Sequence, residues 1–70
     1  MKYQIEIGSP PEYEELVAYI IIDDVEVALI NKERGPENME IEFLDCQDIK
    51  HIPLLLFMEA IEKSRKALSV

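Results

Sequence analysis

The chain has 70 residues, a formal net charge of −8 at pH 7 and a single cysteine, Cys46. A chain this short forms one domain, residues 1–70, and buries only about 60% of its unfolded surface, so it is marginally stable alone. One cysteine excludes an internal disulfide and fits a reducing compartment, which leaves association with another chain as the remaining source of stability.

The longest uninterrupted apolar run, Leu16–Ile22, has seven residues. A membrane helix needs roughly 18, and no targeting signal is visible, so we expect a soluble, cytoplasmic protein with no membrane partner. Residues 1–62 carry a net charge of −11, whereas residues 63–70 carry +3. An acidic chain repels phosphate backbones, which excludes nucleic acid as a partner. The charge would steer the chain towards a basic protein, although it also serves solubility alone.

Residues 2–7 alternate polar and apolar side chains, which predicts a half-buried strand. Pro10 and Pro11 end this strand, because proline cannot donate to a strand ladder. Two apolar segments follow, Leu16–Ile22 and Val25–Ile30, separated by Asp23-Asp24. This spacing predicts a hairpin with a two-residue turn.

Both strands of the predicted hairpin are apolar on both faces. With a two-residue turn, one face of the pair holds Leu16, Ala18, Ile20, Ile22, Val25, Val27 and Leu29. The other face holds Val17, Tyr19, Ile21, Ala28 and Ile30. A single helix can cover only one face of a sheet. We therefore expect the face that carries Tyr19 to be uncovered and to contact a partner, in a contact whose burial would contribute on the order of 5–10 kcal/mol gross.

The rest of the chain predicts one more strand and one helix. Residues 31–38 form a polar connection, and Met39–Phe43 then alternates strictly, which predicts a fourth strand. From Pro53 to about Ser69 the apolar spacing becomes helical. The expected buried stripe consists of Leu54, Phe57, Met58, Ile61 and Leu68.

Leu55 flanks this stripe, and we expect it to stay exposed and to contact a partner. The predicted fold is a two-layer α+β domain. It has a four-stranded antiparallel sheet, the element order β-β-β-β-α, and one C-terminal helix packed on one face of the sheet.

The one metal-like cluster of the sequence holds Asp45, Cys46, Asp48 and His51, which are all possible zinc ligands. Their spacing matches no standard metal motif, and no oxyanion site accompanies the thiol. The favoured interpretation is structural: Asp48 caps a turn, Cys46 is a small buried apolar residue, and His51 leads into the helix. We predict no catalytic residue, metal or cofactor.

Five acidic residues between positions 33 and 45 are expected to form one patch that faces a basic partner: Glu33, Glu37, Glu40, Glu42 and Asp45. A simpler role for Glu40 and Glu42 is protection of a solvated edge strand from aggregation.

From Glu15 to Phe43 the sequence reads ELVAYIIIDDVEVALINKERGPENMEIEF. This stretch resembles short acidic bacterial proteins, several of which are similar to immunity proteins of polymorphic toxin systems; it has Asp23-Asp24 where that type has an Asp-Gly turn. The resemblance implies a stoichiometric binder that has no chemistry of its own. The leading hypothesis is an immunity- or antitoxin-type inhibitor that would act by occluding the active surface of its partner. The alternatives are a structural homodimer or accessory subunit and, third, a small metal-binding or thiol enzyme.

Overall fold

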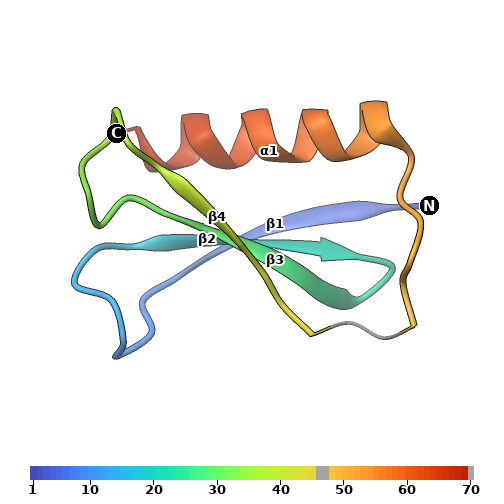
Figure 1. Cartoon of the computed structure of the whole chain (residues 1–70), viewed down its shortest axis with the longest axis horizontal. Coiled ribbons are helices and arrows are strands. Elements are labelled where there is room, and N and C mark those ends of the chain that lie inside the picture. The colour runs from blue at the N-terminus through green and yellow to red at the C-terminus, as the bar shows by residue number, and fades with distance from the viewer. Residues whose placement is uncertain (46–47, 70) are drawn as a thin grey trace.

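The computed structural model describes residues 1–45 and 48–69 and confirms the predicted α+β architecture (Figure 1). Four strands form one antiparallel sheet in the order β1-β2-β3-β4, and the helix α1 lies across one face of it. The elements are β1 Tyr3–Gly8, β2 Val17–Ile22, β3 Val25–Asn31, β4 Glu40–Phe43 and α1 Leu54–Leu68. We call the sheet face under α1 the helix-side face and the opposite one the outer face.

The turn between β2 and β3 has the predicted two residues. Asp23 and Asp24 both have positive φ angles, 47° and 69°. A two-residue hairpin turn of type I′ requires a positive φ at both positions. Aspartate tolerates the left-handed region better than most residues. The Asp23 carboxylate also accepts a hydrogen bond from the Lys2 backbone N–H at 2.9 Å, which ties the turn to the start of β1.

A β-bulge changes the face membership of β3. Ile22 pairs with Val25 as expected, but the register shifts beside Ile20, so that Ile20 pairs with Ala28 rather than with Val27. Val27 is the extra residue, and it joins the buried cluster under α1. Beyond the bulge every side chain of β3 lies on the face opposite to the one predicted.

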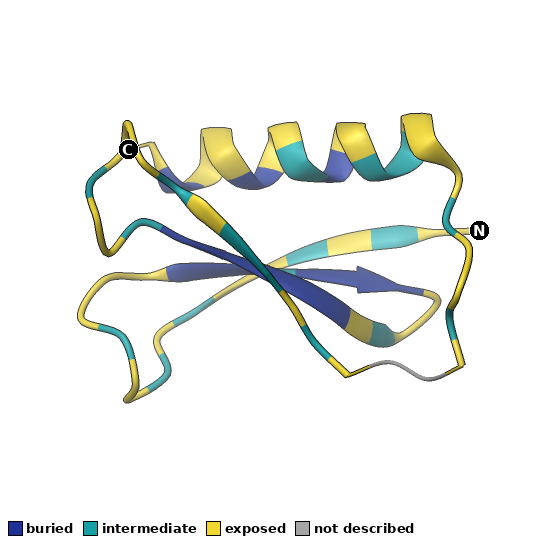
Figure 2. Cartoon of the chain, viewed as in Figure 1, coloured by how far each residue is buried: buried dark blue, intermediate teal, exposed yellow. Residues whose placement is uncertain are grey.

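The prediction that Ala28 and Ile30 belong to an uncovered face is therefore wrong. Both are buried in the helix-side core, whereas Leu29 lies on the outer face, paired with Tyr19. The reason is physical: when both faces of a strand are apolar, the sequence pattern cannot fix the register, and one bulge reverses the faces. Figure 2 shows that the second half of β3 is buried and that β2 is buried except at Tyr19.

Helix α1 packs on the sheet through small residues. Its buried residues are Ala60, Ser64 and Leu68, and the Ser64 hydroxyl donates to the Ala60 carbonyl at 2.8 Å, which satisfies it inside the core. Small side chains let the helix approach the sheet closely. Phe57 and Ile61 flank this contact, half-buried.

This orientation corrects the predicted helix stripe. Leu54 and Met58, which were expected to be buried, are 72% and 53% exposed. The cause is a rotation of the helix that brings Ala60 and Ser64 to the sheet and turns the larger residues of the first turns outward. The predicted exposure of Leu55 is confirmed.

The helix begins one residue after the predicted start, because Pro53 is the N-cap rather than the first helical residue. Its far end is held to β3 by Lys32, whose Nζ donates to the Leu68 carbonyl at 2.8 Å. Lys63 Nζ lies 5.3 Å from the centroid of the Tyr3 ring, on the β1 side of the helix. Within the described residues, no helix combines the length and hydrophobicity needed to cross a membrane.

Candidate functional site

The outer face of the sheet is closed by the chain itself. Val17 is fully buried, and Ile21 and Leu29 are 8% and 5% exposed. Only Tyr19 of the predicted contact residues on this face is half-exposed. The expectation of an open apolar face is therefore wrong, and the outer face offers no free contact surface at Val17 or Ile21.

Part of the cover comes from Tyr19 itself. Its ring lies against Gly8 at the end of β1, so closely that a Cβ at Gly8 would lie 2.8 Å from the ring. Tyr19 also belongs to a row of directly paired residues that runs across the sheet. In this row it pairs with Glu6 of β1 on one side and with Leu29 of β3 on the other. An aromatic ring placed over a glycine fills the space that a side chain would occupy.

A polar network on the same face starts in the connection between β1 and β2. The Tyr13 hydroxyl donates to Glu42 Oε2 at 2.5 Å, and Asn31 Nδ2 donates to the same oxygen at 2.7 Å. Tyr13 precedes β2 and Glu42 lies on β4, so this bond crosses β3 on the outer face. The hydrogen bond to the Glu42 carboxylate, with desolvation and the negative charge of Glu42, raises the pKa of Tyr13 to about 12.

Glu33 continues this network. Its two carboxylate oxygens accept the backbone N–H groups of Glu14 and Glu15 at 2.9 and 2.8 Å, and its own N–H donates to Asn31 Oδ1 at 3.2 Å. Asn31 is therefore the centre of the network and is almost fully buried. The carboxylates of Glu33 and Glu42 hold the β1–β2 connection against the sheet, so they have a structural role whatever else they bind.

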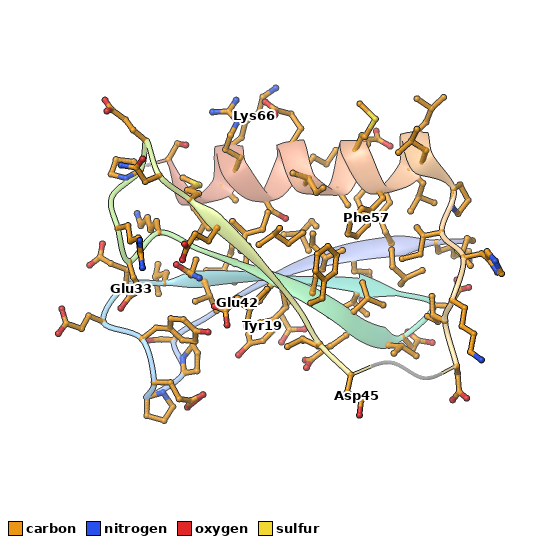
Figure 3. All side chains as sticks on the ribbon, viewed as in Figure 1. Tyr19, Glu33, Glu42, Asp45, Phe57 and Lys66 are labelled. Carbon is orange, nitrogen blue, oxygen red and sulfur yellow. The ribbon has the colours of Figure 1, made fainter. Side chains whose placement is uncertain are left out.

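The predicted acidic patch does not form one cluster. Figure 3 shows Glu33 and Glu42 on the same side of the molecule, with Asp45 beyond the far end of β4. Glu37 and Glu40 are exposed, and Glu40 lies 3.7 Å from Arg34 in a solvent-exposed ion pair. Of the five acids, Glu40 and Glu42 share the outer face of β4, and these two are the acids nearest to a sheet edge.

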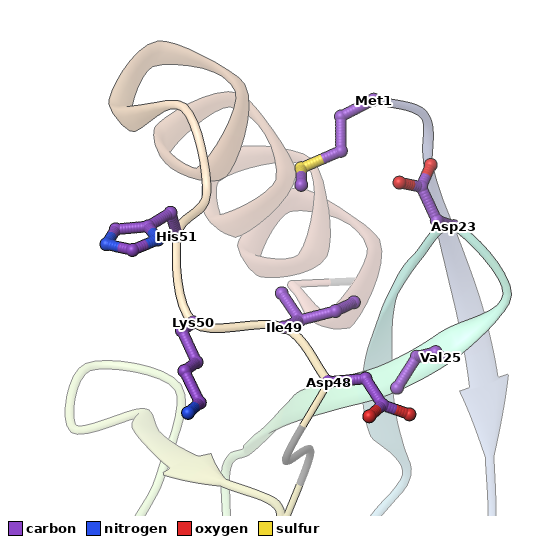
Figure 4. Close-up of a pocket in the computed structure, with 7 residues that line it drawn as sticks. All are labelled: Met1, Asp23, Val25, Asp48, Ile49, Lys50 and His51. Atoms are coloured by element: carbon purple, nitrogen blue, oxygen red, sulfur yellow. The ribbon is translucent and has the colours of Figure 1, made fainter.

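The possible metal ligands are not assembled into a site in the described residues. No group of three or more histidine, cysteine, aspartate or glutamate side chains with metal-binding spacing occurs in residues 1–45 and 48–69. Cys46 lies outside the described residues. Asp48 and His51 line a cavity of about 550 Å³ at the end of the sheet, but Figure 4 shows the His51 ring turned away from the Asp48 carboxylate.

A different apolar surface is exposed, on the helix side of β4. α1 packs mainly over β1 and β2 and less closely over β3, and it meets β4 through the Phe57 ring. Phe43 is 73% exposed, although its ring stacks on Phe57 with a centroid distance of 6.4 Å. Leu54 and Met58 precede Ile61 by seven and three residues, so they lie on the same flank of the helix as Ile61.

Between this flank and β4 is a cavity of about 200 Å³, lined by Ile30, Met39, Glu40, Ile41, Ile61 and Arg65. The positive charge of Arg65 is neutralised by Glu62 on the same helix, because the Arg65 guanidinium donates a hydrogen bond from Nε to the Glu62 carboxylate at 3.1 Å. This hydrogen bond lowers the pKa of Glu62 and raises that of Arg65. We call the cavity and the exposed Phe43 beside it the edge groove.

The edge groove is absent from the sequence-based expectations for two reasons. Ile41 and Phe43 alternate with glutamates, as the buried residues of a half-buried strand do. The alternation therefore does not show whether a helix covers the apolar side of the strand. Leu54 and Met58 satisfy helical core spacing. Only the small residues Ala60 and Ser64 signal that the helix turns another side to the sheet.

Comparisons of the chain with models of protein families, with curated proteins and with solved structures gave no match.

Proposed function

We propose that this chain is a non-catalytic protein-binding module whose partner is a basic protein. It would act in the manner of an immunity- or antitoxin-type inhibitor, by occluding the active surface of that partner. The observation that supports this proposal best is the exposed apolar surface of Phe43, Leu54 and Met58 on a chain of net charge −8. Exposed apolar surface rimmed by charge is typical of protein interaction sites, and the acidic charge favours a basic partner.

The proposal is tested on the products of the reading frames adjacent to this one. We expect one of them to be a basic protein that forms a complex of fixed stoichiometry with this chain and loses its own activity in the complex. The association rate should fall as salt is added, because charge steers the encounter. An unrelated basic protein of similar size and charge is the control.

Two outcomes would contradict the proposal. In one, none of the neighbouring products binds. In the other, the unrelated basic protein binds equally well, which would show that the charge alone is responsible.

A structural homodimer or accessory subunit is the second candidate function. It is favoured by Leu54 and Leu55, which are 72% and 78% exposed in the first turn of α1. Light scattering coupled to size exclusion would separate the two, and a monomer at high micromolar concentration would reject the homodimer. Leu55→Glu should abolish self-association if the helix is the contact.

A further inference from the structure

We propose that the edge of β4 is the docking site, and that the partner adds a strand to it whose side chains alternate between apolar and basic. This inference rests on the proposed function, since it specifies how the basic partner is held. Addition of a strand to an open sheet edge is a common mode of peptide recognition, in which main-chain hydrogen bonds give affinity and alternate side-chain positions give specificity.

The main-chain groups of β4 are arranged for such an addition. In the described part of the chain, β4 is an edge strand with β3 as its one neighbour in the sheet. Its pairing with β3 includes Glu42 opposite Leu29, and the Leu44 N–H donates to the Val27 carbonyl at 2.9 Å. Because hydrogen-bonding direction alternates along an antiparallel strand, Ile41 and Phe43 direct their main-chain N–H and C=O groups away from β3.

The side chains of β4 specify the pattern of the added strand. Ile41 and Phe43 lie on the helix-side face, in rows with the core residues Ile30 and Ala28, whereas Glu42 lies on the outer face opposite Leu29. Glu40 has the same parity as Glu42. Every second residue of an incoming strand would lie beside Ile41 and Phe43. The alternate residues of that strand would lie beside the two glutamates. Apolar residues suit the first set of positions, and lysine or arginine suits the second.

The edge groove provides room for the apolar positions. Its cavity of about 200 Å³ lies between β4 and Ile61 on α1, and it is present because the helix packs mainly over β1 and β2. An aliphatic side chain of an added strand would enter it and would also cover Phe43, which is 73% exposed.

The other edge, β1, does not offer the same combination. There α1 lies close on the helix-side face, and the outer face carries Lys2, Gln4 and Glu6, with a single acid. β4 is therefore the edge that combines an apolar groove on one face with two acids along the same strand, Glu42 on the outer face and Glu40 at the groove itself.

A second copy of this chain fits β4 poorly. A symmetric dimer pairs the strand with itself in antiparallel orientation. If Ile41 faces Ile41 of the copy, Glu40 faces Glu42; if Ile41 faces Phe43, Glu42 faces Glu42. Like charges directly opposite each other destabilise a strand pair. The acids of β4 thus disfavour self-pairing and favour a basic strand.

The test uses a short fluorescein-labelled peptide that alternates lysine with valine. We expect it to bind the full chain, measured by fluorescence anisotropy. A peptide of the same composition, with its lysines and valines in separate blocks, should bind at least about tenfold more weakly because it cannot satisfy both faces at once. In NMR spectra, binding should shift the amide signals of Ile41 and Phe43 and slow their hydrogen exchange.

Matched variants of the protein locate the site. Phe43→Lys should weaken binding of the alternating peptide about tenfold or more. Leu55→Lys introduces the same charge at another exposed apolar position. Leu55 is two residues from Phe57, roughly opposite on the helix, and its substitution should change the affinity less than about twofold. Glu40→Gln should reduce the salt dependence of binding, whereas Glu6→Gln on β1 should not.

Phe43 is largely exposed, so its substitution should leave the fold intact, and a circular dichroism spectrum of each variant checks this. The inference is overturned if the alternating peptide does not bind, if the block peptide binds equally well, or if the shifted amides belong to β1. It is also overturned if Phe43→Lys and Leu55→Lys have equal effects. None of these results bears on a complex with a neighbouring gene product, so failure of this docking mode is distinguishable from failure of the proposed function.

Discussion

The two faces of the sheet are both rich in apolar side chains, but they are covered by different means. On the helix-side face, Ile20, Ile22 and Ile30 are buried beneath α1. On the outer face, Val17 and Leu29 are just as well buried, yet no helix lies there, and the chain closes this face with Tyr19 and a hydrogen-bonded network. A small domain can thus cover a second apolar face without a second layer of secondary structure.

The difference teaches that the position of the exposed apolar surface depends on how far α1 and the hydrogen-bonded network each extend across the sheet. The helix, which is the larger covering element, packs mainly over β1 and β2 and touches β4 at the Phe43–Phe57 contact, which leaves most of the Phe43 side chain exposed. The network on the outer face reaches β4 through Glu42. The apolar surface left open is therefore at one edge of the better-covered face.

The largest expected effect is on the helix-side core. Ile20 is fully buried, so Ile20→Ala removes buried methyl groups and leaves a cavity, and should lower the free energy of unfolding by about 2–5 kcal/mol. Chemical denaturation measures this. Ile7→Ala, at a position that is 43% exposed, is the control and should cost less than about 1 kcal/mol. Equal costs at the two positions would contradict the described core.

The next effect is on the network of the outer face. Asn31→Ala removes the Asn31 bonds to Glu42 and to the Glu33 N–H. Glu42 keeps its bond from Tyr13, but the Glu33 N–H loses its acceptor, and we expect a cost of about 1–3 kcal/mol. Amide hydrogen exchange in residues 9–16 should become faster, because Glu33 anchors that segment. Asn38→Ala loses a single exposed bond of 3.4 Å and should have little effect. Unchanged exchange in residues 9–16 would show that the network does not hold this cover in place.

A smaller effect is expected where Tyr19 lies over Gly8. The Cβ introduced by Gly8→Ala would lie 2.8 Å from the Tyr19 ring, and the shift needed to relieve this overlap should cost about 1–2 kcal/mol. In a Tyr19→Val background the ring is absent and the same substitution should cost less. The double-mutant cycle isolates this contact; additive effects would mean that the ring does not depend on the glycine.

The smallest effect is the pH dependence of the Tyr13–Glu42 bond. The pKa of Tyr13 is raised from 10.0 to about 12 in the folded protein, so the bond contributes fully below pH 10 and its contribution is lost as the pH rises through about 12. Ultraviolet titration of the folded protein should show one phenol that ionises near pH 12. Tyr13→Phe should remove that phenol and reduce the loss of stability between these two pH values. If the late phenol persists in the variant, the bond is assigned to the wrong tyrosine.

The order and type of the elements could be predicted from the sequence, because local patterns determine them. Residues 2–7 and Met39–Phe43 alternate, Asp23-Asp24 separates two apolar runs, and Pro53 precedes a helical repeat. Each signal lies within a few residues of the element that it predicts. The strand and helix bounds accordingly differ from the predicted ones by only one residue.

The faces and the site could not be predicted, because they depend on contacts between distant residues. The bulge at Val27 has no signature in a strand that is apolar on both faces. The bond from Tyr13 to Glu42 joins residues 29 positions apart. The rotation of α1 depends on how closely Ala60 and Ser64 fit the sheet, and residue spacing does not reveal this.

The position of α1 in the chain has a consequence for biosynthesis. All four strands precede the helix, so the ribosome releases the sheet before Ala60 and Leu68 are available to cover its helix-side face. During this interval Ile20, Ile22 and Ile30 are open to other nascent chains, and exposed strands of this composition aggregate. Residues 1–53 carry a net charge of −9, so two such unfinished chains repel each other. The acidity of the strands would thus oppose aggregation of unfinished chains, independently of any partner that the protein binds.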